Sequence, residues 1–169
     1  MVIFGIDPGT VTTGYGLIES SPGGFKVREF GCIHTDAQQP FALRLKHIYD
    51  QICKIILHQH PDELALEDVF YAANAKMVLR IGQARGVALL AAANHQLPIC
   101  EYSPREVKQA VVGNGAASKE QVQRMVASLL HLEEVPTPFD VADALAVAIC
   151  HGQRVGKSDR MLAAESKPR

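Results

Sequence analysis

The sequence predicts one α/β domain in which helices flank both faces of a mixed five-stranded sheet. Two short apolar stretches, Val2–Asp7 and Glu63–Glu67, have the pattern of buried strands, and each ends in a carboxylate. Amphipathic segments with helix-start signals fill most of the remaining chain. Because 47% of the 169 residues are apolar, a single domain of this length has enough apolar surface to form a core.

The first half of the chain is expected to form most of the sheet. Strands are predicted at Val2–Asp7, Gly14–Ser20 and Phe25–Thr35, and their short connections favour an antiparallel meander. Apolar residues then recur at helical spacing until His60, which predicts a helix. The strand Glu63–Glu67 follows this helix, so we expect it to return to the sheet parallel to the first strand.

The second half is expected to supply one more strand and most of the helices. A helix rich in small residues is predicted over Ala73–His95, and a strand follows at Leu97–Tyr102. Three further helices have start signals at Ser103, Ser118 and Thr137. In each case an acid or an amide follows the hydroxyl residue three positions later, which is the pattern of a capping box. The sheet would then contain three antiparallel strands followed by two parallel ones.

Composition indicates where the protein works and how far its domain extends. The chain has no apolar stretch of roughly 18 residues and no basic segment followed by an apolar core at its start. We therefore expect a cytoplasmic protein, in which four isolated cysteines are reduced core thiols. The domain is predicted to cover residues 1–152, and the polar residues 153–169 are predicted to form a flexible tail.

Charge is distributed unevenly along the chain. The net charge is only −1, which argues against wholesale non-specific binding of nucleic acid. Residues 71–124 nevertheless carry seven basic and three acidic side chains, a local excess of four positive charges. Such an excess beside clustered acids suits a metal-using enzyme with a polyanionic substrate, although solvated helix faces would give the same composition.

Four acidic residues are predicted to converge at one edge of the sheet. Asp7 and Glu67 end two strands that we expect to be parallel neighbours, so their carboxylates would emerge at the same edge. Asp140 and Asp143 share one face of an otherwise apolar helix. Alternatively, Asp7 caps an Asp-Pro-Gly turn, and Asp140 stabilises the positive end of a helix dipole. Asp143 lies among apolar neighbours, where an acid needs a partner.

Oxygen ligands without histidine or cysteine favour a hard cation. Mg²⁺ is the expected ion at the four carboxylates, and Mn²⁺ is expected to substitute for it. A divalent cation would also relieve the repulsion among converged acids. Two ions about 3.5–4 Å apart could stabilise the attacking water and the leaving oxygen of a phosphoryl displacement. The chain has no GxxxxGK[ST] motif, so ATP is not the obvious substrate.

Several motifs in this sequence resemble those of the RuvC Holliday junction resolvases, in the same order, over roughly residues 1–151. These motifs are GIDPG at 5–9, GYG at 14–16, LEDVF at 66–70, GQARG at 82–86, VKQAV at 107–111 and DVADAL at 140–145. Taken together they are highly specific, whereas the DPG turn alone occurs in ribonuclease-H-like nucleases, sugar kinases and other proteins.

The resemblance implies a ribonuclease-H-like fold and a homodimer that resolves four-way DNA junctions by symmetric paired nicks. It further implies Mg²⁺ dependence, a role in DNA recombination and repair, and cooperation with the RuvA–RuvB branch-migration complex. The metal acids of the family fall on Asp7, Glu67, Asp140 and Asp143, and some relatives carry histidine at the position of Asp140. Two alternatives are a related nuclease acting on RNA–DNA hybrids or damaged DNA, and an inactive nucleic-acid-binding scaffold.

Further residues are candidates for DNA contacts. Aromatic side chains next to the acids could stack on unpaired bases or pack in the core, an amide could read a base edge or cap a helix, and basic side chains could bind phosphates. The candidates are Phe70, Tyr71, Asn74, Arg80, Lys108 and Lys119, of which the family resemblance best supports the two lysines.

The dimer interface is predicted on the small-residue helix. Gly82, Gly86, Ala88 and Ala91 would permit close approach of a second subunit, or alternatively close packing of the helix on its own sheet. The histidines are interpreted as ordinary surface or core residues, and His151 is among them.

Overall fold

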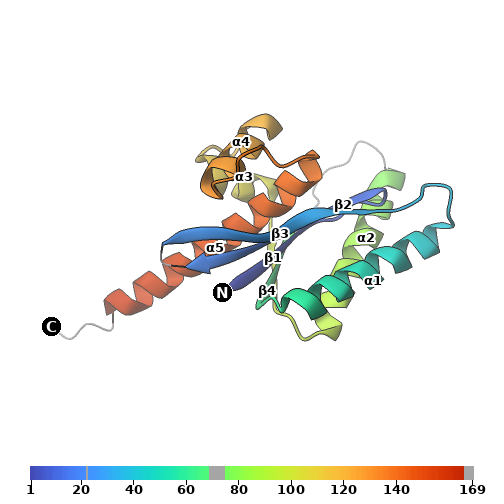
Figure 1. Ribbon diagram of the computed structural model, residues 1–169, viewed down its shortest axis with the longest axis horizontal. Coiled ribbons are helices and arrows are strands. Elements are labelled where there is room, and N and C mark those ends of the chain that lie inside the picture. Colours follow the sequence, from blue (N-terminus) through green and yellow to red (C-terminus); the bar gives the residue numbers. More distant parts are fainter. Residues whose placement is uncertain (22, 69–74, 166–169) are drawn as a thin grey trace.

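The computed structural model describes the backbone of residues 1–21, 23–68 and 75–165, and the side chains of those residues as far as 156 (Figure 1). Its sheet has the strand order β3-β2-β1-β4-β5. The antiparallel part and the parallel part confirm the predicted mixed sheet. The strands are β1 (Val2–Asp7), β2 (Thr12–Ser21), β3 (Gly24–His34), β4 (Glu63–Glu67) and β5 (Ile99–Tyr102).

Helices cover both faces of the sheet, as predicted (Figure 1). One layer contains α1 and α2, and the other contains α3, α4 and α5. Each layer forms a separate apolar core with the sheet residues that face it. The helices are α1 (Phe41–Gln59), α2 (Ala75–Asn94), α3 (Pro104–Val112), α4 (Lys119–Leu129) and α5 (Phe139–Glu165).

The position of β1 in the middle of the sheet, with helices on both faces, explains why its sequence is apolar. Successive side chains of a strand point to opposite faces of the sheet. Phe4 and Ile6 pack in the core below α1 and α2, whereas Ile3 packs in the core below α5. By the same alternation, Asp7 at the end of β1 belongs to the face that α5 covers.

Local start signals are realised for two of the three helices that carry them. Ser103 and Ser118 cap α3 and α4, and each forms a complete capping box with the residue three positions later. The third helix starts differently, because α5 begins at Phe139 and Thr137 therefore lies outside the N-cap position. The start predicted from the sequence pattern thus differs from the observed start of α5 by no more than two residues.

Helix α5 also extends further than expected. It continues to Glu165, whereas we predicted a flexible tail after Gly152. Residues 153–165 include several strong helix formers, which allow the helix to propagate. The predicted boundary between a nuclease domain and a tail at residue 152 stays a prediction, because α5 passes through this position without a break. Among the described residues, no helix combines the length and apolar content that crossing a membrane requires.

Glycines in β1 and β2 allow α5 to lie directly on the sheet. A Cβ atom at Gly5 would overlap the carbonyl oxygen of Ala144, and one at Gly14 would overlap the carbonyl oxygen of Asp140. Gly14 is also the register partner of Asp7. The first turns of α5 therefore cross the sheet next to the end of β1, at a distance that only glycine permits.

We predict that Gly14→Ala lowers the free energy of unfolding by roughly 1–3 kcal/mol, as overpacking of a close contact does. Urea unfolding measures the effect. Gly23→Ala is the matched control, because the nearest atom to its added Cβ is the Ser21 hydroxyl oxygen at 3.9 Å. Equal stability of the two variants would contradict the close approach of α5.

Candidate active site

The sheet brings Asp7 and Glu67 to the same edge. Strands β1 and β4 are parallel, and Ile6 is the register partner of Leu66, so the acids follow at equivalent positions. Glu67 shares its side of β4 with Ala65, which packs in the core below α5. Both carboxylates therefore lie on the face that α5 covers, at the carboxyl ends of parallel strands.

The first turns of α5 bring the other two acids to this edge. The carbonyl oxygen of Asp140 lies over Gly14, beside the end of β1. Asp143 follows one turn later and interacts electrostatically with both Asp7 and Glu67. The structure thus brings together all four acids that the sequence singled out.

Burial and mutual repulsion raise the pKa of the two strand acids. Burial has the largest effect on Asp7, followed by the charges of Asp143, Glu67 and Asp140, and together they raise its pKa from 3.8 to about 8. The pKa of Glu67 rises from 4.5 to about 7, first through burial and then through the charge of Asp143. The fold therefore concentrates more negative charge here than it balances.

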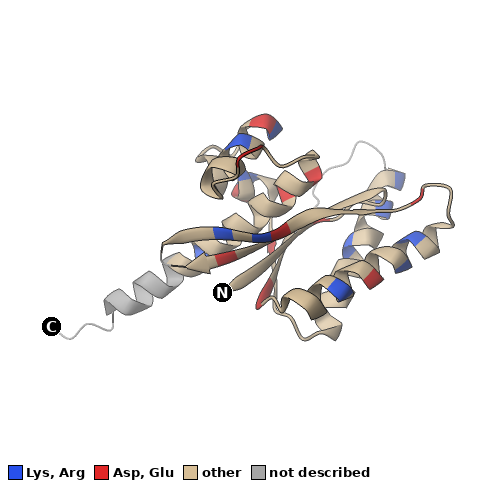
Figure 2. Ribbon diagram, in the orientation of Figure 1, with Lys and Arg blue, Asp and Glu red and all other residues tan. Residues whose placement is uncertain are grey.

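Two lysines face the same acids. The Lys119 ammonium lies 2.7 Å from a carboxylate oxygen of Asp143. Burial alone would lower the pKa of Lys119, but its hydrogen bond to Asp143 and the nearby acids outweigh this effect and raise it. Lys108 and Lys119 line a cavity of about 210 Å³ together with Glu67 and Asp143. Acidic residues at the start of α5 thus lie beside basic residues of α3 and α4 (Figure 2).

The donor set fits a hard divalent cation. All four acids offer only oxygen, which is the ligand that Mg²⁺ and Mn²⁺ prefer. The raised pKa values of Asp7 and Glu67 indicate an excess of negative charge that a cation would neutralise in place of protons. Within the described parts of the chain, no three of these acids bring their oxygens within 4.8 Å of one another. A cation would have to draw them closer.

A buried arginine holds the turn that follows Asp7, and sequence reasoning missed it. The Arg44 guanidinium donates to the carbonyl oxygen of Thr10, and its Nε donates to the Thr35 hydroxyl at 3.0 Å. That hydroxyl donates to the same carbonyl oxygen at 2.6 Å. Arg44 lies in the amphipathic pattern of α1, where a charged residue reads as solvent-exposed, and only the tertiary structure shows that it is buried.

The predicted DNA contacts fall into three groups. Lys108 and Lys119 lie beside the acids, as described above. Arg80 is exposed on α2, which lies on the opposite face of the sheet from α5, and its guanidinium lies 5.4 Å from the centre of the Phe41 ring. The remaining candidates, Phe70, Tyr71 and Asn74, lie outside the described residues.

The structure corrects two of the predicted dimer residues. Ala88 and Ala91 are buried in the core between α2 and the sheet, so they offer no surface to a second subunit. Their small size serves close packing within the chain. Gly82 and Gly86 are exposed instead, and a Cβ atom at either would meet open space. Leu79 and Leu90 are exposed on the same helix.

Comparison with known proteins adds independent information. The family model of "Crossover junction endodeoxyribonuclease RuvC" matches residues 3–151. The proteins of that name from Moorella thermoacetica and Desulforamulus reducens are 54% and 52% identical to this chain over 151 and 153 residues. These alignments cover 89% and 90% of this chain, and 90% and 94% of the relatives.

A solved structure gives the same assignment. Thermus thermophilus RuvC, in a complex with a Holliday junction substrate, superimposes with a TM-score of 0.86 at 33% sequence identity. The alignment covers 92% of this chain and 96% of that one. The expected ribonuclease-H-like fold is thereby confirmed. On sequence, fold and the order of its motifs, the chain belongs to the RuvC family of crossover junction endodeoxyribonucleases.

Proposed function

We propose that this protein is a Mg²⁺-dependent endonuclease that resolves four-way DNA junctions by symmetric paired nicks. The observation that carries this proposal is the acid cluster at the ends of β1 and β4, with two lysines beside it, in a chain of the RuvC family. The relatives named above are bacterial, so the proposed setting is recombination and DNA repair in a bacterial cytoplasm, together with the RuvA–RuvB complex.

Asp7, Glu67, Asp140 and Asp143 are the residues that would hold the cation. A divalent metal at these oxygens supplies Lewis-acid stabilisation of charge on the transferred phosphate, and two ions would serve the attacking and leaving oxygens. Lys119 restrains Asp143 and partly offsets the negative field at Asp7 and Glu67. This offset favours the approach of a phosphodiester, which brings further negative charge.

The basic side chains around the acids are the proposed contacts to the DNA backbone. Lys108 and Lys119 are close enough to the centre to position the scissile phosphate. Arg80 would bind a phosphate on the α2 side. Phe70 and Tyr71 are proposed to stack on bases at the junction, and Asn74 to contact a base edge, because they follow Glu67 closely in the chain.

Neutralising one acid should abolish nicking without preventing junction binding. We expect Asp7→Asn or Glu67→Gln to slow cleavage of a mobile four-way junction by more than about tenfold. The negative charge of the transition state would lose its stabilisation by the metal. Junction affinity measured without metal should stay the same or increase, since a negative charge is removed near phosphate. Asp50→Asn is the control, because Asp50 pairs with Lys46 on the exposed surface of α1.

Two outcomes would count against this function. Cleavage at more than a tenth of the wild-type rate by both acid variants would show that these acids do not take part in the reaction. Faster cleavage of an RNA–DNA hybrid or a linear duplex than of the junction by the wild-type protein would favour another nuclease of this fold.

The same acids should make stability dependent on pH when metal is chelated. The pKa of Asp7 is about 8 in the folded state and 3.8 ordinarily, so the folded state retains the proton more strongly. The free energy of unfolding should therefore fall as pH rises from about 4 to about 8. Urea unfolding at several pH values measures this decline, which should be shallower in Asp7→Asn. A wild-type profile that coincides with that of Asp7→Asn would contradict the raised pKa.

A homodimer is proposed because one acid centre makes one nick, whereas symmetric resolution needs two matched centres. The exposed face of α2 is the proposed interface. Leu79, Gly82, Gly86 and Leu90 recur at intervals of three or four residues and therefore form one stripe along the helix. Leu79 and Leu90 supply apolar area, and the glycines leave room for a facing helix.

We predict that Leu90→Arg yields folded monomers, because it places a charge within this stripe. Light scattering gives the mass, and circular dichroism reports the fold. Val135→Arg is the control, because Val135 is an exposed apolar residue in the loop before α5 and should leave the dimer intact. Ala91→Arg should instead destabilise the monomer, since Ala91 is fully buried. A dimeric Leu90→Arg protein would exclude this face of α2 as the dimer interface.

A further inference from the structure

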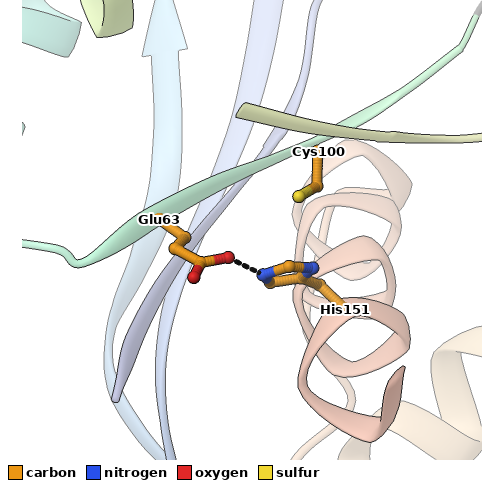
Figure 3. Close-up of side chains that lie close together, drawn as sticks. All are labelled: Glu63, Cys100 and His151. Carbon is orange, nitrogen blue, oxygen red and sulfur yellow. Dashed lines mark hydrogen bonds and ion pairs between the residues drawn. The ribbon is translucent and has the colours of Figure 1, made fainter. Parts of the chain in front are cut away.

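A second group of ionisable side chains lies on the α5 face of the sheet. Glu63, Cys100 and His151 each offer one ligand atom, and these atoms all lie within 4.8 Å of one another (Figure 3). Within the described residues it is the only such group of three. The Nε2 atom of His151 lies 2.5 Å from a carboxylate oxygen of Glu63, and the Cys100 thiol lies on β5 beside them.

The sheet register explains why these residues meet. Cys100 is the parallel partner of Ala65, and Glu63 lies two residues before Ala65 on the same side of β4. Helix α5 crosses this part of the sheet with Cys150 and His151 packed inward, so the imidazole is directed at the start of β4. His151 is 2% exposed, whereas Glu63 and Cys100 are partly exposed, which leaves the site open on one side.

A fourth residue fixes the direction of the imidazole. The Tyr102 hydroxyl lies 2.6 Å from Nδ1 of His151, a buried contact on the side of the ring away from Glu63. Histidine ligands of metals are commonly held in this way by a partner on the second ring nitrogen. We propose that Glu63, Cys100 and His151 form a site for a borderline-soft divalent cation such as Zn²⁺, distinct from the carboxylate centre.

The donor set determines the class of ion. Thiolate and imidazole favour Zn²⁺ and similar transition metals, whereas Mg²⁺ prefers an all-oxygen site such as the one at Asp7. Three protein ligands would leave a fourth position of a tetrahedral ion for water. The two centres would thus select different cations from the same solution.

Binding would exchange protons in a defined way. The Cys100 thiol would lose its proton to solvent, because the thiolate is the metal ligand. The imidazole would bind through Nε2, so the proton that Nε2 donates to Glu63 in the free protein would have to leave this atom, and a proton on Nδ1 would then donate to the oxygen of Tyr102. Burial and the Glu63 charge raise the pKa of Cys100, so the thiol stays protonated until a cation replaces the proton. The thiol should therefore contribute about one released proton per bound cation.

The site is separate from the carboxylate centre, although the same two elements carry both. Glu63 and Glu67 are four residues apart on β4, about 13 Å at the rise of a strand. Asp143 and His151 are eight residues apart on α5, about 12 Å at the rise of a helix. A cation at Glu63 therefore cannot share ligands with one at Asp7.

Cobalt provides the test, because Co²⁺ substitutes for Zn²⁺ and its spectrum reports thiolate ligands. The full-length protein is titrated with Co²⁺ in excess Mg²⁺, which keeps the carboxylate centre filled. We expect a thiolate-to-cobalt charge-transfer band, visible bands of a four-coordinate ion, and their loss when Zn²⁺ is added. Cys100→Ser should abolish the charge-transfer band, whereas Cys53→Ser should retain it, because Cys53 packs on the opposite face.

Further controls separate this site from the carboxylate centre. Asp7→Asn should keep the cobalt spectrum, since Asp7 is not a ligand of this site, and its failure to cleave junctions would have no bearing on the result. Circular dichroism must show that Cys100→Ser is folded, and Glu63→Ala provides a second variant with weakened cobalt binding. A wild-type protein without the charge-transfer band, or a Cys100→Ser protein that keeps it, would overturn the proposal and leave Glu63, Tyr102 and His151 as a purely structural network.

Discussion

Close contact between α5 and the glycines of β1 and β2 is the constraint on which the acid cluster depends. Gly5 and Gly14 let the helix backbone rest on the sheet, where any side chain would hold it away. The helix consequently begins at the edge of the sheet beside Asp7, and its first turns carry Asp140 and Asp143. The same contact buries the strand acids, since α5 covers the face to which they belong.

This arrangement has an electrostatic cost that the fold only partly offsets. Burial favours the neutral form of Asp7 and Glu67, and the neighbouring acids favour it further. Lys119 neutralises part of the charge through Asp143, and the turn after Asp7 is held by the buried Arg44. A structure that keeps repelling carboxylates near one another in this way favours a divalent cation, which would neutralise their charge and draw their oxygens closer.

Much of the fold could be predicted from local patterns. The apolar strands ending at Asp7 and Glu67, and the capping boxes at Ser103 and Ser118, depend on neighbouring residues and were predicted correctly. The acid cluster followed from strand direction and helical spacing. Burial was harder to predict, because it depends on distant elements: Ala88 and Ala91 could face either a partner or the sheet, and Arg44 looked like a surface residue. The hydrogen bonds of His151 to Glu63 and Tyr102 join residues far apart in the chain, and no local pattern indicates them.

Because α5 and the sheet raise the pKa of Asp7 and Glu67, a divalent cation that binds the acid cluster should displace protons from it. Calorimetric titration of the protein with Mn²⁺ near pH 7, in buffers of different ionisation enthalpy, measures the protons released per bound ion. We expect proton release by the wild-type protein, because Asp7 has a pKa of about 8 and Glu67 one of about 7, and less release by Asp7→Asn. Mn²⁺ binding without proton release, or with equal release by both proteins, would contradict this expectation.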